Sequence, residues 1–362
     1  MSTYNQTLEV SAAKVCHYLR EASRNLSAQQ AHYCAAIGAV HELEEKLKRH
    51  YRMKHAVCVS NATTGLLVIG MAVDLKGCDI VTTPVTYGAT VAGAMILGNR
   101  PVFADVDKHT LTLDPFAARK VITDNTGMLL GVDAFGTPAD SLALRRLADA
   151  HGLWYISDSS QSLGSRMDGL PGGAHADALV VSFTAGKTLF AGEGGAIVTN
   201  NTALYEKLIW YSQHPNRQIR ELGLHHDNEF ALNARISPTA AIWANGMFAA
   251  ALGKLKRYQE KCNRLIEALN DSGLTQILPF EERAIEPAFF RITAVWKGRP
   301  HEITLLQFLR ARKFKVAIAP VPARLLYQQP AFVAQNPSPS LPHHCPTAEK
   351  QLGKAFCLSF VS

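Results

Sequence analysis

Short apolar runs alternate with amphipathic stretches along most of the first 250 residues. Helical spacing of Val40, Leu43, Leu47 and Tyr51, with Ile37 before them, predicts a helix over residues 28–51. Buried strands are predicted at Ala56–Ser60, Ile80–Thr83, Val102–Asp105, Met128–Val132, Leu153–Ser157 and Ala178–Ser182. Between them, helices are predicted at Thr63–Val73, 88–97, 114–121 and 141–150. This alternation predicts an α/β fold whose mainly parallel central sheet is covered by helices on both faces.

A different pattern begins near residue 237. Ser237 is a candidate N-cap whose hydroxyl can cap a long helix, with Pro238 in the first turn and an end near Asp271–Gly273. We place a domain boundary inside this helix, with a large domain at residues 1–250 and a small α+β domain at residues 251–362. The small domain is predicted from an apolar stretch at Phe289–Trp296, a helix around 302–312, a strand at Val316–Ile318 and a Pro-, Ser- and His-rich loop at 334–346.

Composition narrows the class of protein. A chain of 362 residues that is 47% hydrophobic can bury the core of an enzyme-sized protein. Its net charge of +7 favours an anionic partner, but the basic residues are scattered, so we expect no nucleic-acid partner.

Cysteine usage and the N-terminus indicate the compartment. The seven cysteines form no Cys-x-x-Cys pair, which favours free thiols in a reducing cytoplasm. No secretory signal is visible at the N-terminus, and no apolar run reaches the ~20 residues of a membrane span. His343, His344 and Cys345 lack further ligands at usable spacing, so we expect no metal. We therefore expect a cytoplasmic protein without a membrane partner.

Candidate site residues follow four of the predicted strands. They lie in Asn61–Thr64, Thr86–Tyr87, Asp158–Gln161 and Ser182–Lys187. Because ligands of parallel sheets bind beyond the carboxyl ends of the strands, we expect these segments to meet at one edge.

Lys187 and Asp158 have the chemistry for covalent catalysis with an aromatic cofactor. A lysine amine held neutral by its surroundings can act as a nucleophile, although a lone loop lysine is more often a solvated charge. A carboxylate at Asp158 ends an apolar strand and needs a cation, such as the protonated ring nitrogen of pyridoxal 5'-phosphate (PLP). The alternative is that Asp158 caps a following helix.

Three further positions suit a phosphate and a planar ring. The turn Asn61–Thr64 opens a helix, so its free N–H groups and the Thr63 hydroxyl can bind an anion, or it is an ordinary capped turn. Ser182 can add a phosphate contact. Tyr87 can stack on a ring, although such an aromatic is more often part of the core.

Several ordered motifs resemble the DegT/StrS family of PLP-dependent aminotransferases, which have fold type I and mostly act on nucleotide-linked keto sugars. The resemblance runs from about residue 37 to 245 through VHELEEKLKRHYRMKHAVCVSNATTGL, PVTYGATVAGAMILGNRPVFADVD, AFGTPAD, ISDSSQSLG, SFTAGK, GEGGAIVTN and LNARISPTAA.

The resemblance implies a role for each matched residue. Lys187 would be the Schiff-base lysine and Asp158 would pair with the pyridine nitrogen. Gln161 would donate to the phenolic oxygen of the cofactor, and Tyr87 would stack on its ring. The phosphate would be held by Ala62, Thr63 and Ser182. Asn233 would reach the cofactor phosphate of a neighbouring subunit, which implies a homodimer with shared active sites, and Arg235 would contact a substrate anion.

The resemblance also implies a reaction, and it leaves alternatives. The expected reaction transfers an amino group from an amino acid donor, L-glutamate, to a keto sugar. Sugar dehydratases of the family carry histidine in place of the lysine, so Lys187 argues against dehydration. Asp133 stands where relatives often have histidine, which leaves the substrate contacts open. The altered Asn61–Thr64 turn and an abbreviated C-terminal lobe are compatible with a cyclitol or non-sugar substrate. A lyase-type reaction on the same fold is a separate alternative. A PLP-binding protein without turnover is the rival from another class.

Overall fold

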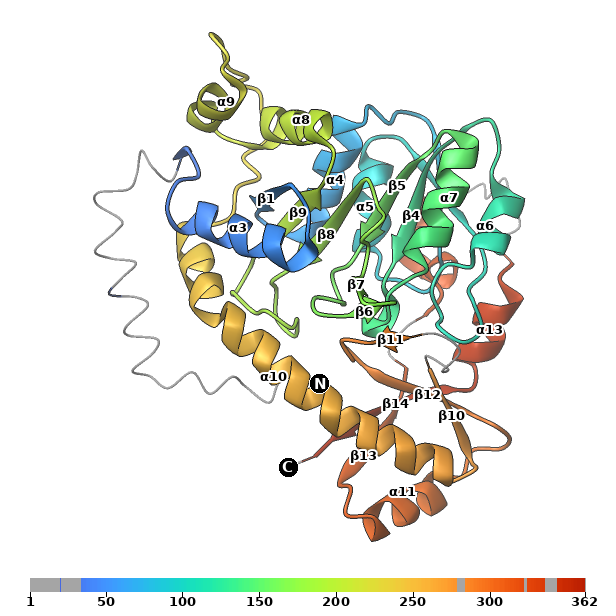
Figure 1. Cartoon of the computed structure of the whole chain (residues 1–362). Coiled ribbons are helices and arrows are strands. Elements are labelled where there is room, and N and C mark those ends of the chain that lie inside the picture. Colours follow the sequence, from blue (N-terminus) through green and yellow to red (C-terminus); the bar gives the residue numbers. More distant parts are fainter. Residues whose placement is uncertain (1–19, 21–33, 279–283, 322–323, 336–343, 362) are drawn as a thin grey trace.

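A seven-stranded sheet forms the centre of the computed structural model, which describes residue 20 and residues 34–278, 284–321, 324–335 and 344–361 (Figure 1). Across the sheet the strands run in the order β1-β9-β8-β5-β4-β2-β3. Their bounds are β1 His55–Val59, β2 Asp79–Thr82, β3 Arg100–Phe103, β4 Thr126–Val132, β5 Trp154–Asp158, β8 Ala178–Ser182 and β9 Gly195–Thr199.

The sheet is mainly parallel, as the sequence predicts. Strands β8, β5, β4, β2 and β3 pair in parallel, whereas β9 pairs antiparallel with both β1 and β8. Six strands therefore end at the same edge. The reversed strand β9 follows the Gly-rich segment after Lys187 directly, without a crossover helix.

Helices cover both faces because successive strand residues point to opposite sides. In β8, Leu179 and Val181 pack in one cluster with α3 (Ala39–Tyr51) and the start of α10 (Pro238–Asp271). Ala178 and Val180 pack on the other face, against α4 (Ala62–Ala72) and α8 (Thr202–Ser212). The remaining helices of this region are α5 Ala89–Ile96, α6 Pro115–Val121, α7 Ser141–His151 and α9 Pro215–Leu222. Burial on both faces explains why the strands are almost continuously apolar.

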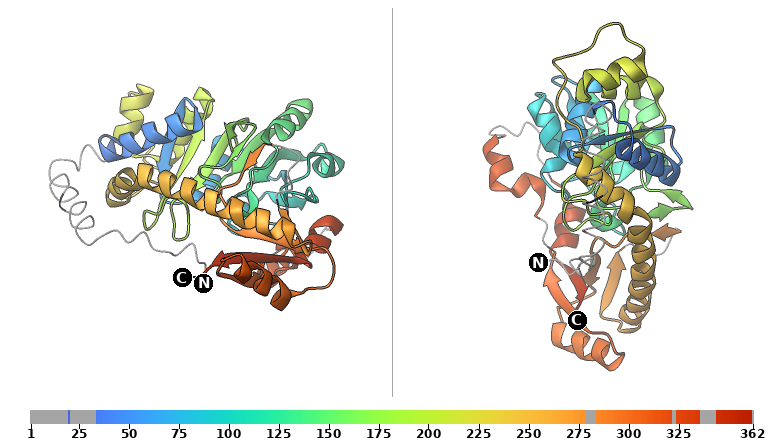
Figure 2. Two further views of the ribbon diagram at one scale, coloured as in Figure 1. Left: turned by 60° about the horizontal axis from the view of Figure 1, so that its bottom comes forward. Right: turned by 90° about the vertical axis from the view of Figure 1, so that its left-hand side faces the viewer.

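Helix α10 extends from the large sheet to a second, antiparallel sheet, as Figures 1 and 2 both show. The order of this sheet is β10-β12-β14-β13, with bounds Thr275–Leu278, Ile292–Trp296, Ala355–Phe360 and Val316–Pro320. Ala240 to Ala251 of α10 pack into the core of the large sheet, while Cys262 to Leu269 pack into the core of the second. The division at residue 250 stays a prediction, and this change of packing partners supports it.

The shorter elements connect these layers. Next to the second sheet lie α11 Glu302–Ala311 and α13 Pro346–Leu352. The 3₁₀ turn η3 Leu326–Gln328 and α12 Pro330–Gln335 pack in a cluster with Val85 and Phe103 of the large-sheet region. A small sheet joins β11 Ile285–Glu286 to the hairpin β6 Arg166–Met167 and β7 Leu170–Pro171. The 3₁₀ turn η2 Ala134–Gly136 follows β4.

Two local predictions are wrong. The helix predicted over 28–51 begins at Ala39, because Gly38 has φ 72° and interrupts it, so Ile37 lies outside the helix; residues 28–33 lie outside the described part. Ser237 occupies the N-cap position of α10, but its hydroxyl makes no capping hydrogen bond. Ser237 is exposed, so water can satisfy the N–H groups that the hydroxyl leaves. Most of the predicted loop at 334–346 also lies outside the described residues.

No helix within the described ranges is long and apolar enough to cross a membrane.

A buried ion pair ties α3 to α9. The Arg217 guanidinium donates two hydrogen bonds of 2.9 Å to the Glu44 carboxylate, and both side chains are almost fully buried. Glu44 also accepts from the Cys58 N–H, and Arg217 donates to Glu221 as well. Burial raises the pKa of Glu44, and the charge of Arg217 opposes that effect. The pair therefore anchors α9, which precedes the segment that carries Asn233 and Arg235.

Replacing Arg217 by Met should lower the free energy of unfolding by about 3–5 kcal/mol, because it leaves Glu44 buried and unpaired. The double variant Glu44→Met, Arg217→Met should be more stable than the single one. Urea unfolding measures both, with Arg119→Met as an exposed control. A double variant no more stable than the single one would contradict this account.

Candidate active site

The structure brings most of the predicted site residues to one edge of the large sheet. Asp158 is the last residue of β5 and Ser182 is the last of β8, while Ala62 and Thr63 open α4 after β1. These three strands end at the same edge because they run in the same direction.

Asp158 is held in place from two sides. Its carboxylate, 7% exposed, accepts a 2.7 Å hydrogen bond from the Thr90 hydroxyl and a 3.2 Å bond from the Ser160 N–H. Thr90 in turn shares a 2.7 Å hydrogen bond with the Thr86 hydroxyl. No helix lies between Asp158 and β6, so the helix-cap alternative is wrong. These bonds orient the carboxylate without neutralising it, and it remains available to a cation.

Gln161 is oriented by the backbone of η2. Its Oε1 accepts a 2.9 Å hydrogen bond from the Phe135 N–H. That bond uses the carbonyl end of the side chain and assigns the amide nitrogen as the group that can donate to a ligand oxygen.

Lys187 follows a turn that requires glycine. Gly186 has φ 84°, a conformation that other residues rarely adopt, and the Lys187 N–H closes the turn on the Thr184 carbonyl at 3.3 Å. The Lys187 Nζ lies 4.7 Å from the centre of the Phe290 ring. Burial lowers the pKa of Lys187; the charge of Asp158 opposes this effect and the charge of Arg291 adds to it. The amine is therefore neutral more often than that of a solvated lysine.

The turn before α4 has free backbone donors. The Asn61 side chain accepts from the Thr64 N–H at 2.8 Å, and the Gly65 N–H bonds the Asn61 carbonyl. The N–H groups of Ala62 and Thr63 precede the helical ladder, so they remain for an anion.

Glycine allows this turn to approach the end of β8. Gly195 is paired with Ser182, and a Cβ at Gly195 would lie 2.8 Å from the Ala62 nitrogen. Ser182 is thereby placed next to the turn, as its predicted role requires.

The other predicted residues lie around this edge. Tyr87 is 76% exposed, so the alternative that it belongs to the core is wrong. Asn233 is exposed and Arg235 is half-buried; both flank Ala234, whose carbonyl accepts a 2.8 Å bond from the Ser60 N–H. This bond and the bridge between Val59 and Arg235 place the segment beside the end of β1.

Asp133 is buried next to the site and is bonded to the protein itself. It is 1% exposed, and its carboxylate accepts hydrogen bonds from the hydroxyls of Ser159 at 2.8 Å and Ser162 at 2.5 Å and from the Ala139 N–H at 2.9 Å. Burial raises its pKa to about 6 despite these bonds, and the charge of Asp158 adds to the effect. Asp133, which stands where relatives often have histidine, therefore supports the turn at residues 158–162 through hydrogen bonds.

Three residues of the site were not predicted. Thr90 supports Asp158, and Phe290 and Arg291 come from the C-terminal region to lie beside Lys187. A signal was present for Arg291, because it is the charged residue within the apolar stretch Phe289–Trp296. The pattern does not tell which residue such a charge would meet.

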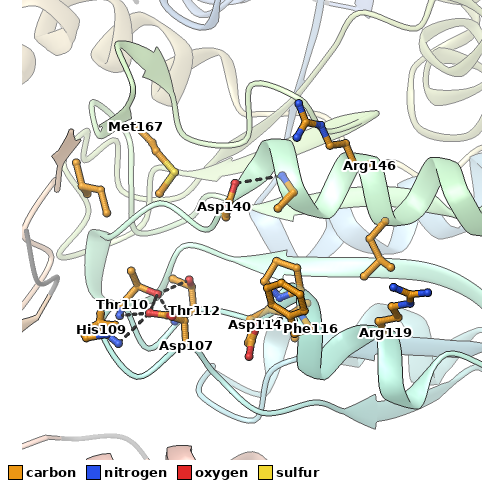
Figure 3. A pocket seen from close by; sticks show the side chains of 15 residues that line it. Asp107, His109, Thr110, Thr112, Asp114, Phe116, Arg119, Asp140, Arg146 and Met167 are labelled. Carbon is orange, nitrogen blue, oxygen red and sulfur yellow. Dashed lines mark hydrogen bonds between the residues drawn. The ribbon is translucent and has the colours of Figure 1, made fainter. Parts of the chain in front are cut away.

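A cavity of about 430 Å³ lies apart from this site, and none of the site residues described above lines it (Figure 3). Its aspartates already serve the backbone: Asp107 accepts from the His109 and Thr110 N–H groups, Asp114 caps α6 and Asp140 caps α7. The carboxylates of this cavity therefore stabilise the backbone around them. The described residues that line the cavity include no lysine and carboxylate arranged as Lys187 and Asp158 are.

The edge as a whole suits a planar, anionic cofactor with a ring nitrogen. It combines a carboxylate, an amide donor, a lysine amine and free backbone N–H groups within one set of strand ends.

Substituting Ala for Gly195 should destabilise the protein by about 1–3 kcal/mol and weaken PLP binding, because the added Cβ meets backbone atoms of Asn61, Ala62 and Val181. Gly298→Ala is a matched control, since nothing lies within 4 Å of its Cβ. Thermal unfolding and PLP titration test this. Equal behaviour of the two variants would show that the contact is unimportant.

Asp133 should make stability pH-dependent in the acidic range. Because its pKa rises from 3.8 to about 6 on folding, its stabilising contribution is complete below pH 3.8 and is lost as the pH rises through 6. The loss should be about 3 kcal/mol. Asp133→Asn removes the titrating group, so the difference in unfolding free energy between the parent and this variant should change with pH over this range. A constant difference would argue against the assignment.

Comparison with known proteins gives one relative over about half of the chain and others over most of its length. A segment of 174 residues is 34% identical to UDP-4-amino-4,6-dideoxy-N-acetyl-beta-L-altrosamine transaminase of Helicobacter pylori (strain ATCC 700392 / 26695). The match covers 47% of this chain and 46% of that protein, so it spans about half the length of this relative.

Solved structures confirm the α/β fold. DesI, determined with its TDP-sugar product, is 26% identical with a TM-score of 0.75, over 95% of this chain and 84% of that chain. DesV of S. venezuelae is 26% identical with a TM-score of 0.73, over 94% of this chain and 91% of that one. The family model of the DegT/DnrJ/EryC1/StrS aminotransferases matches residues 23–362. The chain therefore belongs to the DegT/DnrJ/EryC1/StrS aminotransferase family.

Proposed function

We propose that this protein is a PLP-dependent aminotransferase that moves an amino group from an amino acid, L-glutamate, to a nucleotide-linked keto sugar. The observation that carries the proposal is that a half-buried lysine, whose pKa is lowered, and a buried carboxylate that Thr90 orients lie at one sheet edge. A lysine that serves only as a surface charge stays in water, whereas Lys187 is desolvated near a buried carboxylate.

The residues of this edge fit PLP group by group. Asp158 would face the ring nitrogen, and the Gln161 amide would donate to the phenolic oxygen, since its carbonyl is already bonded to Phe135. The amides of Ala62 and Thr63 and the Ser182 hydroxyl would hold the phosphate. Tyr87, which is exposed, would cover the ring.

Each residue has a distinct task. PLP, when bound, supplies an electron sink, which depends on a protonated ring nitrogen. The Asp158 carboxylate holds that proton. Lys187, whose amine is desolvated, would take a proton from the substrate carbon and return it to a neighbouring atom. Gln161 and Tyr87 fix the plane in which this transfer takes place.

The substrate class rests on charge and on relatives. The net charge of +7 suits nucleotide diphosphates, glutamate and a cofactor phosphate, all of which are anionic. Relatives point the same way: the Helicobacter pylori protein is named a UDP-linked sugar transaminase, and DesI was solved with a TDP-sugar. The lysine at position 187 favours transamination over dehydration.

We further propose a homodimer in the cytoplasm. Asn233 is exposed at the end of a segment that also carries Phe230, whose side chain is 98% exposed. A neighbouring subunit would bury this segment and receive Asn233 at its phosphate site. Free cysteines at positions 34, 58, 78, 262, 345 and 357 are consistent with a reducing compartment.

Purified protein supplied with PLP should show a visible absorption band that adding L-glutamate removes. Lys187→Ala should lose this band and lower turnover by at least about 10²- to 10⁴-fold, because it removes the residue that moves the proton. Lys207→Ala, at an exposed lysine of α8, is the control and should behave like the parent. A protein that binds no PLP, or a Lys187→Ala variant with full activity, would refute the proposal.

A further inference from the structure

One aromatic ring lies close to two cations at the site. The Phe290 ring has the Lys187 Nζ 4.7 Å from its centre and the Arg291 Cζ 5.2 Å from it. An aromatic face attracts a cation, so this ring can retain both side chains close to each other. Phe290 and Arg291 come from the C-terminal region, whereas Lys187 lies in the segment that joins β8 to β9 of the large sheet.

The backbone around Arg291 is fixed by the large domain. The Arg291 N–H donates to the Phe135 carbonyl at 3.1 Å, and the Ala288 N–H donates to the Gly136 carbonyl at 2.8 Å. The Phe135 N–H in turn donates to Gln161. Two successive hydrogen bonds through Phe135 therefore link Arg291 to Gln161, which we propose contacts the cofactor.

Within the described ranges, the guanidinium group has no counter-ion of its own. Among the described residues no carboxylate lies within ion-pairing distance of Arg291, although the side chain is half-buried. The charges of Lys187 and Arg291 also repel each other, which is part of the reason that the amine loses its proton readily. An anion at this point would satisfy the arginine and relieve the repulsion.

We propose that Arg291 binds an oxyanion of the substrate, beside the Phe290 ring and within reach of the reacting lysine. This inference rests on the proposed function and identifies the residue that positions its substrates. A planar guanidinium fork matches a carboxylate or a phosphate with two parallel hydrogen bonds. The carboxylate of the amino donor and the diphosphate of a nucleotide-linked acceptor share this chemistry.

Anion binding at Arg291 also changes the pKa of Lys187. Among the described residues, the charged groups that act on the Lys187 amine are Asp158 and Arg291. An anion on Arg291 cancels one of them, so the amine should hold its proton more tightly when substrate is present. Arg291 would thereby both position the substrate and, through its charge, change the pKa of Lys187.

Two unreactive probes separate the two sources of the oxyanion. Glutarate carries the carboxylates of the donor without its amine, and UDP carries a diphosphate without a sugar to be aminated. Calorimetric titration of the PLP-loaded protein with each probe would be compared among the parent, Arg291→Gln and Arg291→Lys. Arg312→Gln is the matched control, because this arginine stacks on Phe308 at the far end of the C-terminal region, 3.7 Å from the ring centre.

Arg291→Gln should weaken at least one probe by about 10- to 100-fold, the range for losing a charged hydrogen bond. The probe affected identifies the source: glutarate indicates the donor carboxylate and UDP the acceptor diphosphate. Arg291→Lys should recover part of the loss, since it keeps the charge without the planar fork. Unchanged affinity for both probes in Arg291→Gln would overturn the proposal. If the glutamine variant does not fold, unchanged affinity for both probes in Arg291→Lys would overturn it equally.

A spectroscopic readout tests the coupling to Lys187. Glutarate or UDP, whichever binds, should raise the pH midpoint of the visible band in the parent and leave it unchanged in Arg291→Gln. Failure of this inference is distinct from failure of the proposed function: a protein without a PLP band refutes the function, whereas a PLP-loaded Arg291→Gln variant that binds both probes as tightly as the parent refutes this assignment alone.

Discussion

Two consecutive residues with left-handed backbone, Phe135 and Gly136, join the floor of the site to the C-terminal region. Phe135 has φ 57° and Gly136 has φ 90°, and a left-handed phenylalanine costs roughly 1–2 kcal/mol. The conformation lets the Phe135 N–H reach Gln161 while its carbonyl reaches Arg291. It also brings the two segments so close that a Cβ on Gly136 would lie 2.7 Å from the Phe290 nitrogen. The strain is offset by the bonds that hold both sides of the site together.

The close approach of the C-terminal region to η2 also determines which charges surround the Lys187 amine. Alone at the sheet edge, the lysine would face the Asp158 carboxylate and keep its proton. The C-terminal region adds the Phe290 ring, which helps to desolvate the amine, and the Arg291 charge, which repels it. Burial and repulsion outweigh the attraction of Asp158, so the pKa of the amine falls. A general base that works near neutral pH requires this balance.

Beneath this edge, the 158–162 turn is held by buried polar groups. Asp133 gathers the hydroxyls of Ser159 and Ser162, and Thr90 fixes Asp158 from the neighbouring helix. Such a network restricts the two residues that would contact a cofactor, Asp158 and Gln161, to one arrangement. Its cost is a carboxyl group at Asp133 whose pKa is raised by burial.

Local pattern was sufficient for six of the seven strands of the large sheet, their order along the chain and the residues that follow them, but it gave no range for β9. Each buried strand is a short apolar run, and in a parallel sheet the residues after such runs must meet at one edge. Asp158, Ser182, Ala62 and Lys187 were therefore predictable as a group. The pattern was weaker at element ends: the helix α3 begins only after Gly38, although the apolar spacing extends further towards the N-terminus, and the Ser237 hydroxyl does not cap. Those outcomes depend on backbone conformation and solvent access, which periodicity does not report.

By itself, then, the sequence determined the α/β architecture, the candidate lysine and acid, and the family, because these depend on residue type and on distances along the chain. Only the tertiary structure decided that Gln161 presents its amide nitrogen, that Asp133 is a support, and that Arg291 stands beside Lys187. The physical reason is that hydrogen bonds and charges act through space. Residues 135, 161, 187 and 291 are far apart along the chain, and the fold alone brings them within contact distance.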